Sequence, residues 1–292
     1  MKKEFNKGLL LTSLGSFWWG FIGVIYFEYV SFIGHIELVV HRCLWTAVML
    51  IITTSFLQKW NIFFKIISIK KNLIALFLSG FLIFLNWAIW VYAVATERII
   101  DASIGYFIMP IISVLLGYIF FKEKLNNKRL FSILLVLVSI LIIIFLNLKS
   151  LPWVGLIVAF SWAFYNLVRK KINIDTDVGL LIESLYIFPF ALVVFYFITK
   201  SGFNDFNLSN PGLSIFLILA GPMTVIPLFL YVRGVELIGL GPTGMIFYIT
   251  PTLQFILGYF YYNEEFSLIK LLSFIIIWIA VIIYLKDLYE TN

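Results

Sequence analysis

Residues 102–125 read ASIGYFIMPIISVLLGYIFFKEKL, and no charged side chain occurs in this stretch before Lys122. A helix needs about 20 predominantly apolar residues to cross the hydrocarbon of a bilayer. The run is continuously apolar and lacks the polar–apolar alternation that is typical of a membrane β-barrel strand. It therefore predicts a membrane-spanning helix that ends at a cluster of lysines.

Residues 243–266, TGMIFYITPTLQFILGYFYYNEEF, repeat this pattern at a constant offset of 141 residues. Pro110 aligns with Pro251, a Gly-Tyr pair follows each proline after the same interval, and Glu123 aligns with Glu264. A proline within a helix removes one hydrogen bond and kinks the helix. We expect Pro110 and Pro251 to mark bends that face the interior of the bundle. Such a bend either lets the helix act as a gate or is a purely structural kink.

The rest of the chain has the composition of a protein that is surrounded by lipid. Hydrophobic residues make up 62% of its 292 residues and charged residues only 12%, whereas soluble domains contain roughly 45–50% apolar and about 25% charged residues. The sequence therefore predicts an all-α, multi-pass membrane protein. Ten transmembrane helices are expected, at residues 7–27, 35–57, 72–95, 102–121, 128–147, 152–169, 177–199, 211–232, 241–262 and 268–286.

The positive charges predict how these helices are oriented. Of the 21 lysines and arginines, 16 lie on the side that carries the N-terminus, 4 lie on the other side, and Arg42 lies within a helix. Loops rich in Lys and Arg stay in the cytoplasm, so we expect both termini to be cytoplasmic and the protein to lie in the inner (cytoplasmic) membrane. The net charge of +6 then indicates membrane orientation and not nucleic-acid binding.

The repeat divides the chain into residues 1–149 and 150–292. Each half holds five expected helices, and because five is odd, the second half must insert upside down relative to the first. Inverted repeats with a binding site near the midplane are typical of secondary transporters. We expect two inverted five-helix repeats around a central cavity, in a protein that functions as a monomer.

The second expected helix carries Glu37, His41 and Arg42, and at 100° per residue these side chains share one face with Trp45. Charges at bilayer depth are costly and usually face a cavity or a partner, so this face should point inward. Glu183, in the seventh expected helix, lies on the other side of the midplane from Arg42. Arg42 and Glu183 either satisfy each other or nearby backbone carbonyls and fix the packing, or they bind substrate charge or a coupling proton. Glu183, His41 and Glu37 are the candidates for proton coupling.

Aromatic residues form 19% of the chain, and several of them lie inside the expected helices. Aromatic walls can hold an aromatic ring or a quaternary ammonium by cation–π attraction, although each ring could also serve packing alone. The further candidates for substrate binding are Trp19, Trp45, Asn86, Trp90, Tyr106, Trp162, Tyr165 and Tyr248.

The residue pattern favours transport over catalysis. The chain has no GxxxxGK[ST] phosphate loop, which argues against ATP hydrolysis. The single Cys43 excludes an internal disulfide and any multi-cysteine metal site, and we expect no metal and no cofactor. The substrates that suit mixed charges and aromatic walls are small amino-acid-like or amine solutes, including quaternary ammonium compounds. A lipid-modifying enzyme or a channel is less favoured.

Several stretches resemble the drug/metabolite transporter superfamily, in its EamA-domain branch, and within it the RarD-like permeases. They are residues 37–45 (ELVVHRCLW), 102–110 (ASIGYFIMP), 170–175 (KKINID), 181–185 (LIESL) and 248–255 (YITPTLQF). They occur in the expected order over nearly the whole chain. The resemblance implies ten helices in two inverted repeats, a central cavity, and export or exchange of small organic metabolites. It also implies the alternative function, a multidrug exporter of the amphenicol type.

Overall fold

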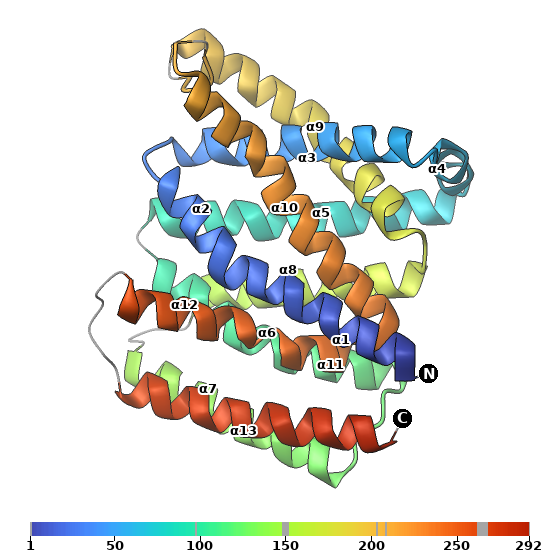
Figure 1. Cartoon of the computed structure of the whole chain (residues 1–292), viewed down its shortest axis with the longest axis vertical. Helices are drawn as coiled ribbons and strands as arrows, with labels where there is room; N and C mark the ends of the chain where they lie inside the picture. The colour runs from blue at the N-terminus through green and yellow to red at the C-terminus, as the bar shows by residue number, and fades with distance from the viewer. Residues whose placement is uncertain are drawn as a thin grey trace.

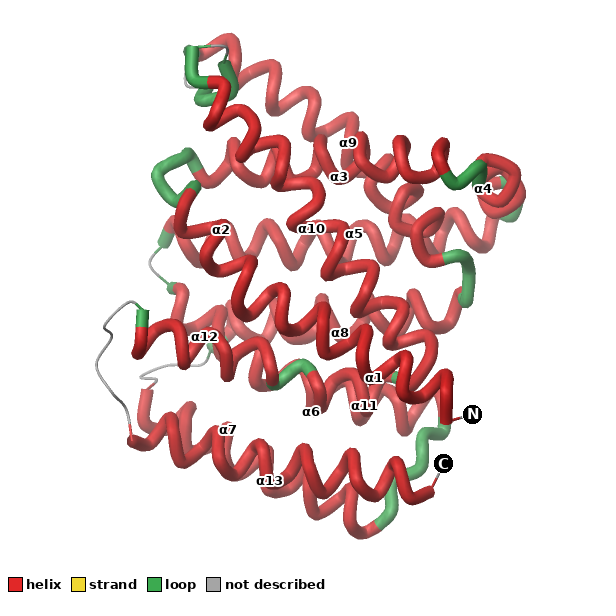
Figure 2. The backbone as a smooth tube through the Cα atoms, viewed as in Figure 1, coloured by secondary structure: helices red, strands yellow, loops and turns green. Residues whose placement is uncertain are grey.

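The computed structural model describes residues 2–96, 98–147, 152–202, 204–207, 209–261 and 268–291. Every regular element within these ranges is a helix, and most of the helices run side by side along one direction (Figure 1, Figure 2). Eight of them are long and apolar enough to cross a membrane. The prediction of an all-α, multi-pass membrane protein is therefore confirmed.

The elements follow one another in a regular up-and-down order. They are α1 (Lys2–Phe17), the π-helical segment η1 (Trp18–Ile22), α2 (Gly23–Tyr29), α3 (His35–Phe56), α4 (Trp60–Ile67), α5 (Lys70–Ala95), α6 (Ile99–Phe121), α7 (Asn127–Asn147), α8 (Trp153–Ile172), α9 (Thr176–Ser201), α10 (Pro211–Ile238), α11 (Leu240–Ile246), α12 (Ile249–Phe260) and α13 (Leu268–Thr291).

Two of the ten expected spans do not meet the same criterion of length and hydropathy. The sixth corresponds to α8, which ends in the three basic residues Arg169, Lys170 and Lys171. The ninth corresponds to α11 and α12, which are separate helices of 7 and 12 residues. The count of ten therefore stays a prediction.

The N- and C-terminal ends of the chain lie at the same end of the bundle (Figure 1). The turn between α2 and α3 lies at the opposite end. An even number of crossings gives this arrangement. Which end faces the cytoplasm stays a prediction.

The two repeated prolines do not behave alike. Pro110 lies inside α6, which is one continuous helix. Pro251 lies in the first turn of α12, and the helix is interrupted just before it, at Phe247 and Tyr248. Because proline has no N–H to donate, the Phe247 carbonyl accepts instead from Thr250, at 2.9 Å. The gate role of both prolines stays a prediction, and Glu264, the expected repeat mate of Glu123, lies outside the described residues.

The sequence did not predict α4, a short helix between α3 and α5. It carries Lys65 on an exposed face and buries Ile66 against α5 and α9. The loop between the second and third expected helices was too short for a further span, but it is long enough for two helical turns at the end of the bundle that carries the termini (Figure 1).

Glycines let the first helix approach its neighbours closely. A Cβ atom added at Gly15 would lie 3.0 Å from the Pro227 carbonyl of α10. A Cβ atom added at Gly20 would lie 2.8 Å from the Thr250 carbonyl of α12. Small residues at such contacts are the usual means by which helices pack in lipid, where no hydrophobic drive is available. The first helix is thereby held against two helices from the second half of the chain.

Candidate functional site

A cavity of about 530 Å³ lies between helices from both halves of the chain. Its wall includes the exposed residues Glu28, Ser31 and His35, which lie in or beside the turn between α2 and α3. The cavity therefore reaches the surface at the end of the bundle opposite to the two termini (Figure 1). Its size is in the range of small-molecule binding sites.

Arg42 of α3 is the charged group deep in this cavity. Its Nε donates to the Thr224 hydroxyl of α10 at 3.1 Å. The guanidinium lies over two aromatic rings, 5.1 Å from the centre of Phe27 and 4.7 Å from that of Trp87. Among the residues that the structure describes, no carboxylate forms an ion pair with it. Most of the guanidinium's five donors are thus available to a ligand.

Aromatic and amide side chains form the walls around Arg42. Besides Arg42, five of the predicted residues line the cavity. The Asn86 amide is held in place, because it donates to the Val158 carbonyl at 2.9 Å and to the Ser161 hydroxyl at 3.0 Å. The five are Trp19, Asn86, Trp90, Tyr106 and Trp162.

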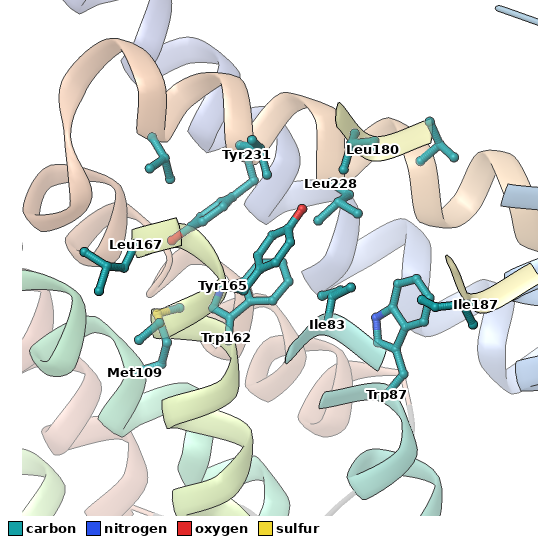
Figure 3. Close-up of a cluster of buried hydrophobic side chains, with 14 of the residues drawn as sticks. Ile83, Trp87, Met109, Trp162, Tyr165, Leu167, Leu180, Ile187, Leu228 and Tyr231 are labelled. Atoms are coloured by element: carbon teal, nitrogen blue, oxygen red, sulfur yellow. The ribbon is translucent and has the colours of Figure 1, made fainter. Parts of the chain in front are cut away.

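The closed end of the cavity is a packed aromatic cluster. Trp162 lies 5.2 Å from Trp19 and 5.6 Å from Tyr231, measured between ring centres, and Phe247 contacts all three. Figure 3 shows Trp162 beside Tyr165 and Tyr231 within the core. These rings fill the centre of the bundle and separate the cavity from the end that carries the termini.

Beyond the aromatic cluster, Glu123 holds the start of α11. Its carboxylate accepts from the backbone N–H groups of Leu240 and Gly241, at 2.8 and 2.9 Å, and lies 3.3 Å from the Lys170 ammonium. The exposed N–H groups of a helix start favour a negative charge. This contact joins the segment after α6 to α8 and α11. It lies at the end of the bundle that carries the termini (Figure 1), which is called the closed side below.

Arg42 and Glu183 do not meet, so the predicted structural pair between them is wrong. Glu183 lies buried on α9, where it accepts from the hydroxyls of Ser79 and Tyr165. Its ionic partner is Arg169 of α8, at 3.5 Å. The two charges were expected on either side of the midplane, but each found a partner on a different neighbouring helix.

The Arg169 network extends to a second carboxylate. Arg169 lies 4.0 Å from Glu236 of α10 and donates to the Thr176 carbonyl at 3.0 Å. Glu236 also accepts from Arg233 and from the Thr176 hydroxyl, both at 2.8 Å. Helices α8, α9 and α10 are thus joined by a buried set of charges on the closed side of the bundle.

His41, Trp45 and Glu37 do not line the cavity. Trp45 Nε1 donates to His41 Nδ1 at 3.1 Å, and His41 Nε2 lies 3.6 Å from Glu37. Glu37 accepts from the backbone N–H groups of Asp205 and Phe206, at 2.9 and 3.3 Å. The face that the sequence placed wholly inward is divided, because α3 packs against α9 on one side and against α10 and α5 on the other.

Tyr165 and Tyr248 are fully buried and likewise lie outside the cavity lining. Tyr165 packs on Trp162 and bonds Glu183. The Tyr248 hydroxyl donates to the Phe107 carbonyl at 2.8 Å, which joins the break before α12 to α6. Both are polar aromatic residues whose hydroxyls are satisfied inside the protein.

The predicted substrate-binding residues do not include Phe27, Trp87, Thr224 or Phe247, which also line the cavity. Thr224 lies in the run GPMTVIP of α10. A polar residue between two prolines in an apolar helix is a signal that could have marked it. For the three aromatic residues no signal separates a cavity wall from ordinary packing in so aromatic a chain.

Within the described residues, no group of three or more His, Cys, Asp or Glu side chains could hold a metal ion. The arrangement of the cavity suits binding of an organic solute: a guanidinium with free donors, one ordered amide, and rings on several sides. Such a site recognises a carboxylate joined to an apolar or aromatic body.

Comparison with known proteins gives three results. The model of the EamA-like transporter family matches the chain twice, at residues 6–145 and 150–286. Protein RarD of Escherichia coli is 31% identical over 290 residues, covering 99% of this chain and 97% of that protein. The uncharacterized transporter YojE of Bacillus subtilis is 33% identical, covering 96% and 94%.

A more distant relative is the chloramphenicol-sensitive protein RarD of Pseudomonas aeruginosa, at 24% identity over 85% of this chain and 83% of that protein. Among solved structures, one crystal structure matches with a TM-score of 0.70 and 10% identity, covering 97% of this chain and 98% of the other. At that identity the match concerns the fold alone.

Proposed function

Because the chain belongs to the EamA-like transporter family, we propose that it is a secondary transporter that moves small, carboxylate-bearing organic metabolites, such as amino-acid-like solutes, across the cytoplasmic membrane. Transport proceeds by alternating access, either as facilitated exchange or coupled to an ion gradient. Its membrane-spanning helices and its full-length similarity to RarD proteins support the general class.

One observation carries the substrate class: Arg42 lies in the cavity with a hydroxyl and two aromatic rings, and without a carboxylate partner among the described residues. A guanidinium recognises a carboxylate through two parallel hydrogen bonds. A substrate carboxylate would accept hydrogen bonds from the Arg42 N–H groups that have no acceptor among the described residues. The body of the substrate would then lie between Trp90, Tyr106 and Trp19.

The proposed transport cycle uses the asymmetry between the two ends of the bundle. The cavity reaches the surface at the end opposite to the termini, which is the outer side under the predicted orientation. The other end is closed by the aromatic cluster, by Glu123 at the start of α11, and by the Arg169 network. Release on the inner side requires these contacts to part while the outer end closes.

A second candidate substrate class is an uncharged aromatic compound of the amphenicol kind. The aromatic walls favour it, and one relative is named for chloramphenicol sensitivity. Amine and quaternary ammonium solutes are less favoured, because Glu183 and Glu37 do not line the cavity. Glu28 does line it, but it is an exposed residue beside the turn between α2 and α3.

Binding to the purified protein separates these classes. Phenylalanine, phenylalaninamide and phenethylamine share one ring and one amino group but differ in the carboxylate. We expect phenylalanine to raise the thermal stability of the protein and the other two to leave it unchanged. Arg42→Lys should weaken phenylalanine binding by about tenfold or more, because lysine cannot form the bidentate contact.

A matched control is Arg98→Lys, which alters another arginine stacked on tryptophan, 5.2 Å from the Trp153 ring and outside the cavity. It should bind phenylalanine like the wild type. Binding of chloramphenicol with no binding of any carboxylate in a wider acid panel would replace the proposed class by the second candidate. Equal binding of all three ring compounds would show that the carboxylate is not recognised and that Arg42 does not select the substrate.

A further inference from the structure

A second, small cavity of about 20 Å³ lies directly behind the wall of the main one. Trp87 of α5 and Leu228 of α10 line both cavities, so their side chains form the partition between them. Figure 3 shows Trp87 and Leu228 with Ile83, Leu180 and Ile187, which surround this small space from α5, α9 and α10. Glu183 of α9 also lines the small cavity.

The small cavity is mostly apolar, but it contains polar atoms that point to a ligand. The Thr46 side chain of α3 is 4% exposed, and its hydroxyl has no hydrogen-bond partner in the protein. Glu183 and Ser184, which both carry polar side chains, also line it. A buried hydroxyl without a partner is costly, so a ligand that bonds Thr46 would remove that cost.

Water matches both the volume and the polar groups. About 10–15 Å³ of such space holds one water molecule, which needs two to four polar partners. Thr46, Glu183 and Ser184 provide three. Other small neutral solutes are too large for this space, and the thin partition of Trp87 and Leu228 makes the main cavity the nearest source of water.

We propose that one water molecule occupies this cavity and passes protons between the main cavity and Glu183, with Trp87 as the barrier between the two. The role of this relay rests on the proposed transport function, but its chemistry does not. In the step, a hydronium in the main cavity gives a proton through this water to the Glu183 carboxylate. One O–H bond forms on Glu183, one breaks on the hydronium, and water is left.

The groups that face Glu183 explain what protonation does. Ser79 of α5 and Tyr165 of α8 donate to it, Cys43 and Thr46 of α3 line the space beside it, and Arg169 of α8 is its counter-ion. Arg169 also lies 4.0 Å from Glu236 of α10, so the charges of Glu183 and Glu236 are coupled through Arg169. A neutral Glu183 attracts Arg169 less, which loosens the link between α8 and α9 on the closed side.

Arg42 connects this relay to the substrate. Its guanidinium lies 4.7 Å from the ring centre of Trp87. A substrate carboxylate that draws Arg42 away frees Trp87 to turn and joins the small cavity to the main one. Substrate binding and proton access to Glu183 are then linked through one ring.

Infrared difference spectroscopy of the purified full chain, titrated with acid alone, tests the relay without any substrate. We expect a carbonyl band of a buried carboxylic acid that Glu183→Gln removes. Thr46→Val, which keeps the shape but loses the hydroxyl, should shift this band to higher frequency, because the acid loses its hydrogen-bonded water. Thr46→Ser should restore the wild-type band.

The matched control is Thr54→Val. Thr54 lies on the same helix, is fully buried, and also has a hydroxyl without a partner, but it lies outside the small cavity. It should leave the band unchanged. Failure of amino-acid binding would not affect these spectra, so the two proposals fail separately.

Three results would overturn the relay. One is the absence of any acid band that depends on Glu183. Another is a band that responds alike to Thr46→Val and Thr54→Val, which would mean that the change is a general effect of α3. The third is loss of the band on adding sodium chloride, but not potassium chloride, at constant pH, because the cavity would then be a sodium site.

Discussion

At the scale of single residues, Arg169 holds the closed side together. Its side chain is fully buried and lies between Glu183 at 3.5 Å and Glu236 at 4.0 Å. Removal of one partner from a buried ionic group leaves uncompensated charge, and such changes cost about 3–5 kcal/mol. The network is therefore more sensitive to loss of the arginine than a surface ion pair would be.

We predict that Arg169→Ala lowers the free energy of unfolding by about 3–5 kcal/mol, measured by denaturation in detergent. The double variant Arg169→Ala with Glu183→Gln should recover part of this loss, because one of the two carboxylates is then neutral. Arg233→Ala is the control: Arg233 pairs with the same Glu236 but is 41% exposed, and its loss should cost less than about 1 kcal/mol. Equal losses for Arg169→Ala and Arg233→Ala would contradict the described network.

The sequence predicted which residues are polar inside the membrane better than it predicted their partners. Arg42 was expected to face inward, and it does face the cavity. The helical wheel, however, treats the face that holds Glu37, His41 and Arg42 as one surface, whereas α3 meets different neighbours across its width. Glu37 and His41 therefore contact the loop after α9, and Arg42 contacts α10. The partner of a buried polar residue depends on which helices are neighbours, and the sequence of a single helix does not specify its neighbours.

At the scale of elements, the break between α11 and α12 and the π-helical turn η1 meet each other. Gly20 lies in η1, and an added Cβ would lie 2.8 Å from the Thr250 carbonyl and 3.0 Å from Leu253. Thr250 in turn donates from its hydroxyl to the Ser16 carbonyl at 2.9 Å. Two irregular helix segments, one from each half of the chain, thus pack together beside the cavity.

We predict that Gly20→Ala destabilises the protein by about 1–3 kcal/mol, because the methyl group would force the two backbones apart. The thermal midpoint in detergent measures the effect. Gly34→Ala serves as the control, since no atom lies within 4 Å of its Cβ position and its φ of −54° suits alanine. Equal midpoints for both variants would show that η1 and α12 can separate freely.

Besides the short helix α4, the irregular helix segments were the part of the fold that the sequence did not predict. Long apolar runs set the long helices, so their existence could be expected from hydropathy alone. The π-helical turn at Trp18 and the interruption of the helix at Phe247 arise from contacts between the two halves of the chain. One such contact joins Tyr248 to α6. Pro251 predicted a disturbance in the ninth helix, while the equivalent Pro110 is accommodated in a continuous one.

At the scale of the whole molecule, the packing pairs are those that a two-fold relation between halves would produce. The first helix packs on α10 and, correspondingly, α8 packs on α5. Helices α3 and α9 pack on each other, as do α7 and α13. Both halves of the chain match the same family model. The inverted orientation of the second half is still a prediction, but these pairings are what it requires.

The predicted orientation can be tested in intact cells after Cys43→Ser removes the native thiol. Cysteines introduced at Lys71 and Lys124 should be shielded from a membrane-impermeant thiol reagent, whereas one at Lys200 should react. All three positions are exposed, so burial does not complicate the comparison. The reverse pattern would mean that the termini lie outside and that the cavity opens toward the cytoplasm.

At this scale the protein is proposed to be a carrier whose cavity binds the carboxylate of its solute at Arg42. Counterflow of radiolabelled phenylalanine in proteoliposomes of the purified full chain tests this most directly. We predict saturable counterflow that unlabelled phenylalanine supports and phenethylamine does not, that Arg98→Lys retains, and that Arg42→Lys lowers by about tenfold or more. Flux without saturation or counterflow, or full activity of Arg42→Lys, would contradict the account.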